Sequence, residues 1–132
     1  MVGIDTNILV RFFAQDDPDQ ARQVDVLMES LSAESPGFIA SVVLAELAWV
    51  LRKNYRIEKA RFIEYIEHLL GSPEIVLENE AALKQVQLRM GSTNADFADC
   101  LIERICANAG CTQTLTFDAN SVRHSGMTLL QS

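Results

Sequence analysis

Short apolar segments that favour β-strands alternate with longer segments of helical periodicity along the whole chain. The strand-like segments are 2–5, 38–40, 74–77, 114–117 and 127–130. The segments with helical spacing are about 7–13, 18–31, 41–55, 58–70, 80–90 and 96–109. Such alternation predicts an α/β fold with a parallel sheet and helices on both of its faces. We expect a three-layer fold with a central parallel sheet of about four to five strands, and Asp5 at the end of a central strand.

The size and composition of the chain fit one globular domain. It has 132 residues, of which 48% are hydrophobic, enough for a single core at this length. We therefore expect one domain over 1–132. No apolar run approaches the length of ~20 residues that crosses a bilayer, and the N-terminus does not resemble a signal peptide. These features predict a soluble protein.

The cysteines favour a reducing compartment. The chain contains three cysteines, Cys100, Cys106 and Cys111, with no Cys-x-x-Cys pair. An odd number without paired spacing argues against a disulfide framework and predicts a cytoplasmic protein. Cys100 and Cys106 are interpreted as small packing residues of a helix. The apolar residues of 41–55 surround most of that helix, so Trp49 is expected in the core.

The net charge of −7 argues against binding to nucleic acid, because affinity for phosphate depends on Lys and Arg. Two features weaken this objection. A bound divalent metal would cancel part of an acidic cluster. The basic residues also concentrate in one stretch, at Arg52, Lys53, Arg56, Lys59 and Arg61. This stretch is either a solvated helix face or a path for a nucleic-acid backbone, and both interpretations stay open.

Acidic residues recur where a parallel sheet would bring them together. Asp5 and Asp118 each follow a predicted strand, Asp96 and Asp99 lie near a predicted helix start, and Glu46 lies inside an apolar helix. Strand ends and the following helix starts share one edge of such a sheet, so these acids can converge. Burying Glu46 would be costly unless it is paired or metal-bound. Oxygen ligands with only two histidines in the chain favour Mg²⁺ or Mn²⁺, an ion that supports phosphodiester hydrolysis without a histidine base.

Four segments resemble the motifs of a known family. They are Ile-Asp-Thr-Asn at 4–7, Leu-Ala-Glu-Leu at 44–47, Asp-Phe-Ala-Asp-Cys-Leu-Ile at 96–102 and Leu-Thr-Phe-Asp at 115–118. Their order and spacing resemble those of PIN-domain nucleases, and within that family the VapC-type toxins of bacterial toxin–antitoxin pairs. The resemblance implies a PIN-like fold and a divalent-metal-dependent endoribonuclease, often dimeric, that a small antitoxin holds inactive.

The resemblance also implies roles for individual residues. It makes Asp5, Glu46, Asp99 and Asp118 the catalytic acids. Of these, Asp5 and Asp99 would be the direct ligands of Mg²⁺ or Mn²⁺. Asp96 is either an auxiliary acid or a helix cap, and the remaining polar supports would be Thr6, Asn7 and Thr116. Arg52, Lys53 and Arg56 are candidates for guiding the RNA backbone.

Two other functions remain as alternatives. The first is a PIN-like module without catalysis that binds RNA or protein; the complete set of acids argues against it. The second is a Mg²⁺-dependent phosphoacceptor or phosphatase-type domain. Against the phosphatase type, Asn7 stands where the second acid of an Asp-x-Asp motif would be. A receiver-type phosphoacceptor would have a lysine after its last conserved strand, and no lysine follows Lys84. A dinucleotide oxidoreductase is disfavoured because the chain has no Gly-x-Gly-x-x-Gly loop.

Overall fold

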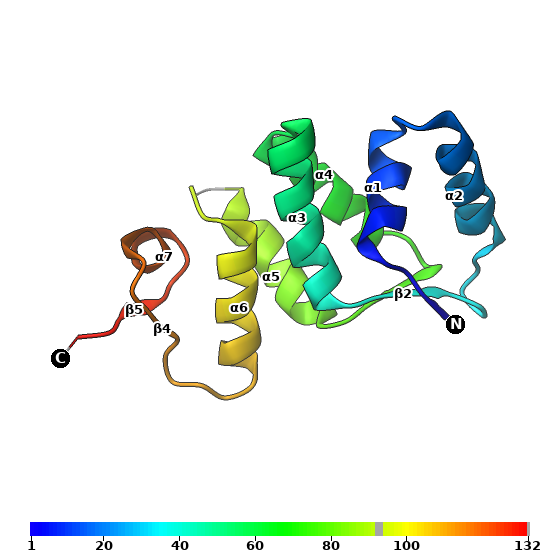
Figure 1. Cartoon of the computed structure of the whole chain (residues 1–132). Helices are drawn as coiled ribbons and strands as arrows, with labels where there is room; N and C mark the ends of the chain where they lie inside the picture. The colour runs from blue at the N-terminus through cyan, green and yellow to red at the C-terminus, as the bar shows by residue number, and fades with distance from the viewer. Residues whose placement is uncertain (92–93, 132) are drawn as a thin grey trace. The chain divides into compact units, whose positions relative to one another are not determined.

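The computed structural model describes residues 1–91 and 94–131 and has an α/β architecture. The chain divides into two compact units, Met1–Glu78 and Asn79–Ser132. The first unit contains β1 (Val2–Gly3), α1 (Thr6–Ala14), α2 (Pro18–Ser30), β2 (Gly37–Ile39), α3 (Ser41–Tyr55), α4 (Lys59–Leu70) and β3 (Ile75–Leu77). The second contains α5 (Glu80–Met90), α6 (Phe97–Asn108), β4 (Leu115–Thr116), α7 (Ala119–His124) and β5 (Thr128–Leu129) (Figure 1).

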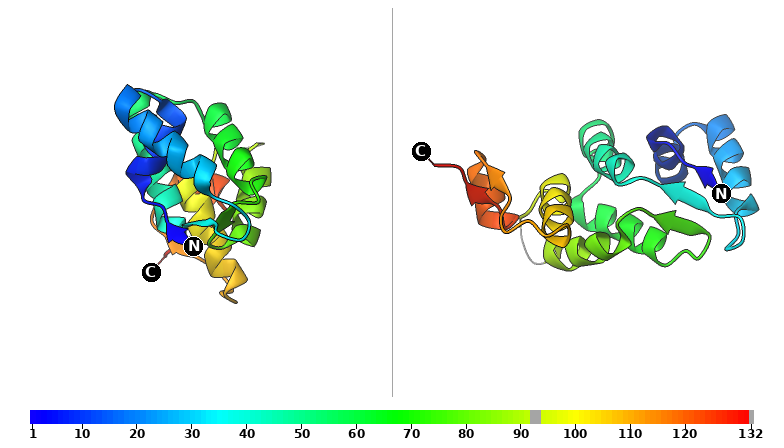
Figure 2. Two further views of the ribbon diagram at one scale, coloured as in Figure 1. Left: turned by 90° about the vertical axis from the view of Figure 1, so that its right-hand side faces the viewer. Right: turned by 90° about the horizontal axis from the view of Figure 1, so that it is seen from below.

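The sheet of the first unit is parallel, in the order β1-β2-β3. Val2 pairs with Gly37, and Gly37 pairs with Ile75, so the three strands lie side by side (Figure 2). Gly37 is buried, and a Cβ atom there would lie 2.5 Å from the side chain of Ile4. A glycine at this position therefore lets the Ile4 side chain pack closely against the central strand.

The α/β class and the parallel strands agree with the sequence prediction, but the strands are distributed differently. In the described residues β4 and β5 pair in parallel as a separate two-stranded ladder of the second unit. The sheet that carries β1 thus has three strands rather than four or five. β1 is one of its edge strands, so the prediction of a central strand before Asp5 was wrong. Apolar segments indicate where strands form, whereas the choice of partner depends on contacts distant in sequence.

Helix α3 packs one narrow stripe into the core of the first unit. Leu44, Leu47 and Leu51 are each 0% exposed and follow one another at three- and four-residue spacing. Trp49 is 53% exposed, so the prediction of a core position for it was wrong. It lies two residues from Leu47 and two from Leu51, about 200° around the helix from each, on the opposite face.

The second unit is built on the pair of helices α5 and α6. Buried residues from both helices form its core, among them Leu83, Val86, Cys100 and Leu101. Burial raises the pKa of the Cys100 thiol, which keeps it in the neutral form and agrees with its interpretation as a packing residue. No helix in the described part of the chain is both long and apolar enough to cross a membrane.

Candidate functional site

Asp5 lies at the junction between β1 and α1. It adopts an extended conformation as the N-cap of α1, and its Oδ1 atom accepts a hydrogen bond of 2.7 Å from the backbone N–H of Thr6. The N-cap is thus the aspartate of the Ile-Asp-Thr-Asn motif, and Thr6 is the first residue of the helix. An acid at a helix N-terminus interacts favourably with the exposed N–H groups there. The short loop between strand and helix therefore fixes the Asp5 carboxylate.

A groove of ≈ 320 Å³ in the first unit brings together four of the residues that the sequence singled out. They are Asp5, Thr6, Asn7 and Glu46. The other lining residues are Val10, Arg11, Val50, Asn54 and Tyr55. Glu46 is exposed, so the expectation of a buried carboxylate inside an apolar helix was wrong. Its helix turns only the leucine stripe inward, which leaves Glu46 facing the groove without a burial penalty.

Thr6, which lines this groove, has a buried side-chain oxygen without a hydrogen-bond partner in the described ranges 1–91 and 94–131. Its side chain is 6% exposed, and among the described residues its Oγ1 atom is the buried side-chain oxygen or nitrogen without a hydrogen-bond partner. A buried hydroxyl without a partner is costly, and such groups concentrate at functional sites. The carboxylates of Asp5 and Glu46 in the same groove are oxygen donors of the kind that Mg²⁺ or Mn²⁺ prefers.

In the second unit, Asp99 and Asp118 are joined by a hydroxyl group. Ser121 Oγ lies 2.8 Å from Asp99 Oδ2 and 3.3 Å from Asp118 Oδ2. Asp99 is in the first turn of α6, and Asp118 is the N-cap of α7, where it accepts from Asn120 N at 2.9 Å. Two helix N-termini thus hold these carboxylates close to each other.

Ser121 was missed by the sequence analysis. Its side chain is 1% exposed, and it lies three residues after the Asp118 cap, on the first turn of a helix that the apolar pattern did not reveal. The combination Asp118-Ala119-Asn120-Ser121 carried a usable signal. An aspartate after a predicted strand is a common N-cap, and it could have indicated the short helix that carries Ser121.

The other predicted polar residues of the second unit support its two acids. Thr116 Oγ1 accepts a hydrogen bond of 3.0 Å from the backbone N–H of Asp118. Asp96 is the N-cap of α6 and accepts from Asp99 N at 3.3 Å. Of the two roles expected for Asp96, the structure shows the helix cap. Side chains from the motifs at 96–102 and 115–118 therefore stabilise the first turns of α6 and α7 by hydrogen bonds.

Each unit contributes two of the four predicted acids. In the part of the chain that the structure describes, no group of three or more His, Cys, Asp or Glu side chains is arranged to hold a metal ion. Asp5 and Glu46 line the groove of the first unit, and Asp99 and Asp118 share Ser121 in the second. The oxygen chemistry of each pair fits Mg²⁺ or Mn²⁺, which usually takes one or two carboxylates directly and keeps several waters.

The basic residues near the end of α3 lie outside the lining of this groove. Arg52, Lys53 and Arg56 are exposed, whereas Asn54 and Tyr55 are the lining residues from the same stretch. Lys53 Nζ lies 6.0 Å from the centre of the Trp49 ring. The Lys53 side chain therefore lies on the exposed face of α3, one turn from Trp49. Glu46 lies on the same face of this helix.

Comparison with known proteins gives the family. No curated protein matches the chain. The PIN domain family matches residues 2–126, which includes every acid of the candidate site. PIN domains are generally nucleases, and nucleic acid is their substrate. Because this match covers nearly the whole chain and the architecture is parallel α/β, the chain belongs to the PIN domain family.

Proposed function

We propose that this PIN-domain protein is a divalent-metal-dependent endoribonuclease, and that all of 1–132 works as one domain. The observation that supports this most strongly is the pairing of the acids within each unit. Asp5 and Glu46 line one groove beside the unpaired Thr6 hydroxyl, and Asp99 and Asp118 share Ser121. The proposal requires these four carboxylates to serve a single reaction.

The four acids have distinct roles in this proposal. Asp5 and Asp99 would hold Mg²⁺ or Mn²⁺, Glu46 would orient the attacking water, and Asp118 would accept hydrogen bonds from water in the site. When bound, the ion stabilises the charge that builds on the phosphodiester and makes the attacking water more acidic. Thr6, Asn7 and Thr116 support the carboxylates, and Asp96 keeps the N-terminus of α6 in place. The products are two fragments, from hydrolysis of one internal phosphodiester bond.

The substrate is RNA in unpaired or loop regions. We expect the protein to cut single-stranded RNA and to leave single-stranded DNA of the same sequence intact under the same conditions, because a site can use the 2′-hydroxyl to distinguish the two. Gel analysis of both labelled oligonucleotides, incubated with protein and Mn²⁺, measures this difference. Equal rates on RNA and DNA would support the nuclease family assignment and contradict RNA specificity.

The resemblance to VapC-type toxins supports a biological setting. We propose a cytoplasmic toxin that forms a homodimer and is inhibited by a small cognate antitoxin. The antitoxin would offer arginine side chains to the acidic groove, where bidentate pairing with carboxylates is strong. Light scattering that gives a monomer at all micromolar concentrations would contradict the dimer. Isolation of the protein from its native host without any small basic protein attached would contradict the antitoxin.

A further inference from the structure

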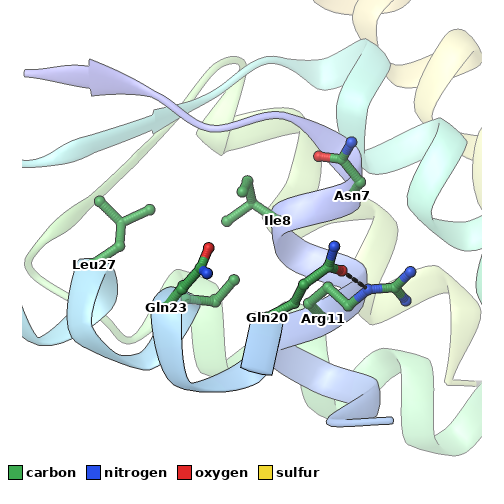
Figure 3. Close-up of a pocket in the computed structure, with 7 residues that line it drawn as sticks. Asn7, Ile8, Arg11, Gln20, Gln23 and Leu27 are labelled. Atoms are coloured by element: carbon green, nitrogen blue, oxygen red, sulfur yellow. Dashed lines mark hydrogen bonds between the residues drawn. The ribbon is translucent and has the colours of Figure 1, made fainter. Parts of the chain in front are cut away.

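Arg11 is the cationic side chain among the residues that line the acidic groove of the first unit. It also lines a second groove of ≈ 430 Å³ between α1 and α2, which Figure 3 shows. Asn7 is likewise shared by both grooves. The linings of the two grooves therefore share these two residues, so the Arg11 side chain borders both grooves.

Neighbouring side chains hold this guanidinium in one orientation. Its Nε atom donates to Gln20 Oε1 of α2, a contact visible in Figure 3. Its Nη1 atom lies 3.2 Å from Asp16 Oδ1 and 2.9 Å from the Tyr55 hydroxyl. Among the described residues, the hydrogen bonds of Arg11 involve Nε and Nη1. The two donors of Nη2 are thus available to a ligand.

Hydrogen bonds within this network also favour the charged forms of Asp16 and Arg11. The Tyr55 hydroxyl donates to Asp16 Oδ2 at 2.8 Å and so lowers the pKa of Asp16. The same hydroxyl is the main cause of the raised pKa of Arg11. The ionised carboxylate of Asp16 and the phenol of Tyr55 therefore orient the guanidinium before any substrate arrives. An oriented guanidinium loses less side-chain entropy when it forms further hydrogen bonds.

We propose that Arg11 binds a phosphodiester of the RNA beside the one that is cleaved. This inference rests on the proposed nuclease function. Asp5 and Glu46 repel the RNA backbone, and a guanidinium that lines the same groove offsets this repulsion at the neighbouring phosphate. Arginine suits this task because its planar donors match the oxygens of a phosphate. In the α1–α2 groove, the amides of Asn7, Gln20 and Gln23 give the continuing strand further hydrogen-bonding groups without added negative charge.

The salt dependence of RNA binding tests this role. The probe is a fluorescein-labelled single-stranded RNA of mixed sequence, and binding is followed by anisotropy in Mn²⁺ at several KCl concentrations. All proteins carry Asp99→Asn to suppress cleavage. For Arg11→Gln we expect a slope of log K against log [salt] that is lower by about 0.7, the change for one lost contact to a single-stranded phosphate. We also expect roughly tenfold weaker binding at low salt.

Two further variants separate phosphate binding from support of the fold. Arg11→Lys keeps the charge, so it should retain the slope while binding more weakly. Tyr55→Phe removes the hydroxyl between Arg11 and Asp16 but leaves the guanidinium, so it should retain the slope even if the melting temperature falls. If Arg11→Gln had the wild-type slope, or if Tyr55→Phe lowered the slope equally, the inference would be wrong.

The failure of this inference is distinguishable from the failure of the proposed function. If the protein without Asp99→Asn cleaves RNA but Arg11→Gln leaves the slope unchanged, only the role of Arg11 is overturned. If that protein shows no metal-dependent cleavage, the proposed function fails, and the inference falls with it.

Discussion

The change of Asp5 to Asn should lower RNA cleavage by at least about a hundredfold and abolish Mn²⁺ binding, while the protein keeps its fold. Removing one group that stabilises charge in a transition state has effects of this size, and here the metal would lose one of its two direct ligands. The fold is retained because Asn is as good as Asp at a helix N-cap. Its amide oxygen can still accept the hydrogen bond from Thr6 N that holds the start of α1.

The matched control is Asp5→Ala, which removes both the charge and the cap. This variant should be as inactive as Asp5→Asn but less stable by about 1 kcal/mol, the typical cost of losing an N-cap side chain. Thermal melting measures the stability difference, and calorimetry with Mn²⁺ measures binding. Wild-type Mn²⁺ affinity in Asp5→Asn would show that Asp5 does not hold the metal, and equal melting temperatures of the two variants would contradict the capping role.

The change of Glu103 to Gln should destabilise the second unit by about 3 kcal/mol. Glu103 is 5% exposed and accepts hydrogen bonds from Arg104, with Nη2–Oε2 at 2.7 Å and Nε–Oε1 at 2.9 Å. Arg89 Nη1 lies 3.4 Å from the same carboxylate. Glutamine would turn an N–H₂ donor toward guanidinium donors and remove the negative charge that both arginines contact. We expect the lower end of the range for breaking a buried ion pair, because both arginines are partly exposed.

Glu80→Gln is the control for this prediction. Glu80 also pairs with a cation of its own unit, Lys84, but both side chains are more than half exposed. Exposed pairs contribute little to stability, so this variant should change the free energy of unfolding by less than about 0.5 kcal/mol. Urea denaturation followed by circular dichroism compares the two variants. A similar loss of stability in both would mean that burial does not determine the contribution of Glu103.

The helices of this protein were largely predictable from local signals. The helix predicted over 80–90 is observed as α5, Glu80–Met90, and the helix predicted over about 18–31 is observed as α2, Pro18–Ser30, with Asp17 as its N-cap. These predictions succeed because caps, proline positions and apolar spacing act within one or two turns. The residue at the cap itself is less predictable. Ser41 looks like a cap, but its hydroxyl donates to the Glu78 carbonyl oxygen, and Ala40 takes the N-cap position.

The strand arrangement and the burial of α3 were less predictable. Each strand in the described residues spans two or three residues, and its pairing is decided by contacts distant in sequence. An apolar composition also does not reveal how wide the buried stripe of a helix will be. Trp49 and Glu46 share one exposed face of α3 because only the leucine stripe meets the core.

The candidate site was predictable as a set of residue types but not in its supporting groups. The motifs pointed to the acids, because carboxylates at strand ends and helix starts have few structural reasons to recur. Ser121 and the Arg11 network could not be derived in this way. Each depends on hydrogen bonds between segments far apart in sequence, such as the 2.8 Å contact from Ser121 to Asp99 or the 2.9 Å contact from Arg11 to Tyr55.

The most direct test of the central claim is a cleavage assay on structured RNA with purified wild-type protein and Asp99→Asn. We predict cleavage by the wild type in Mg²⁺ or Mn²⁺, loss of cleavage in EDTA, recovery when the metal is restored in excess, and a rate at least about a hundredfold lower in Asp99→Asn. Cleavage that persists in EDTA, or a variant that cuts as fast as the wild type, would contradict metal-dependent catalysis by these carboxylates and favour a PIN domain that only binds RNA or protein.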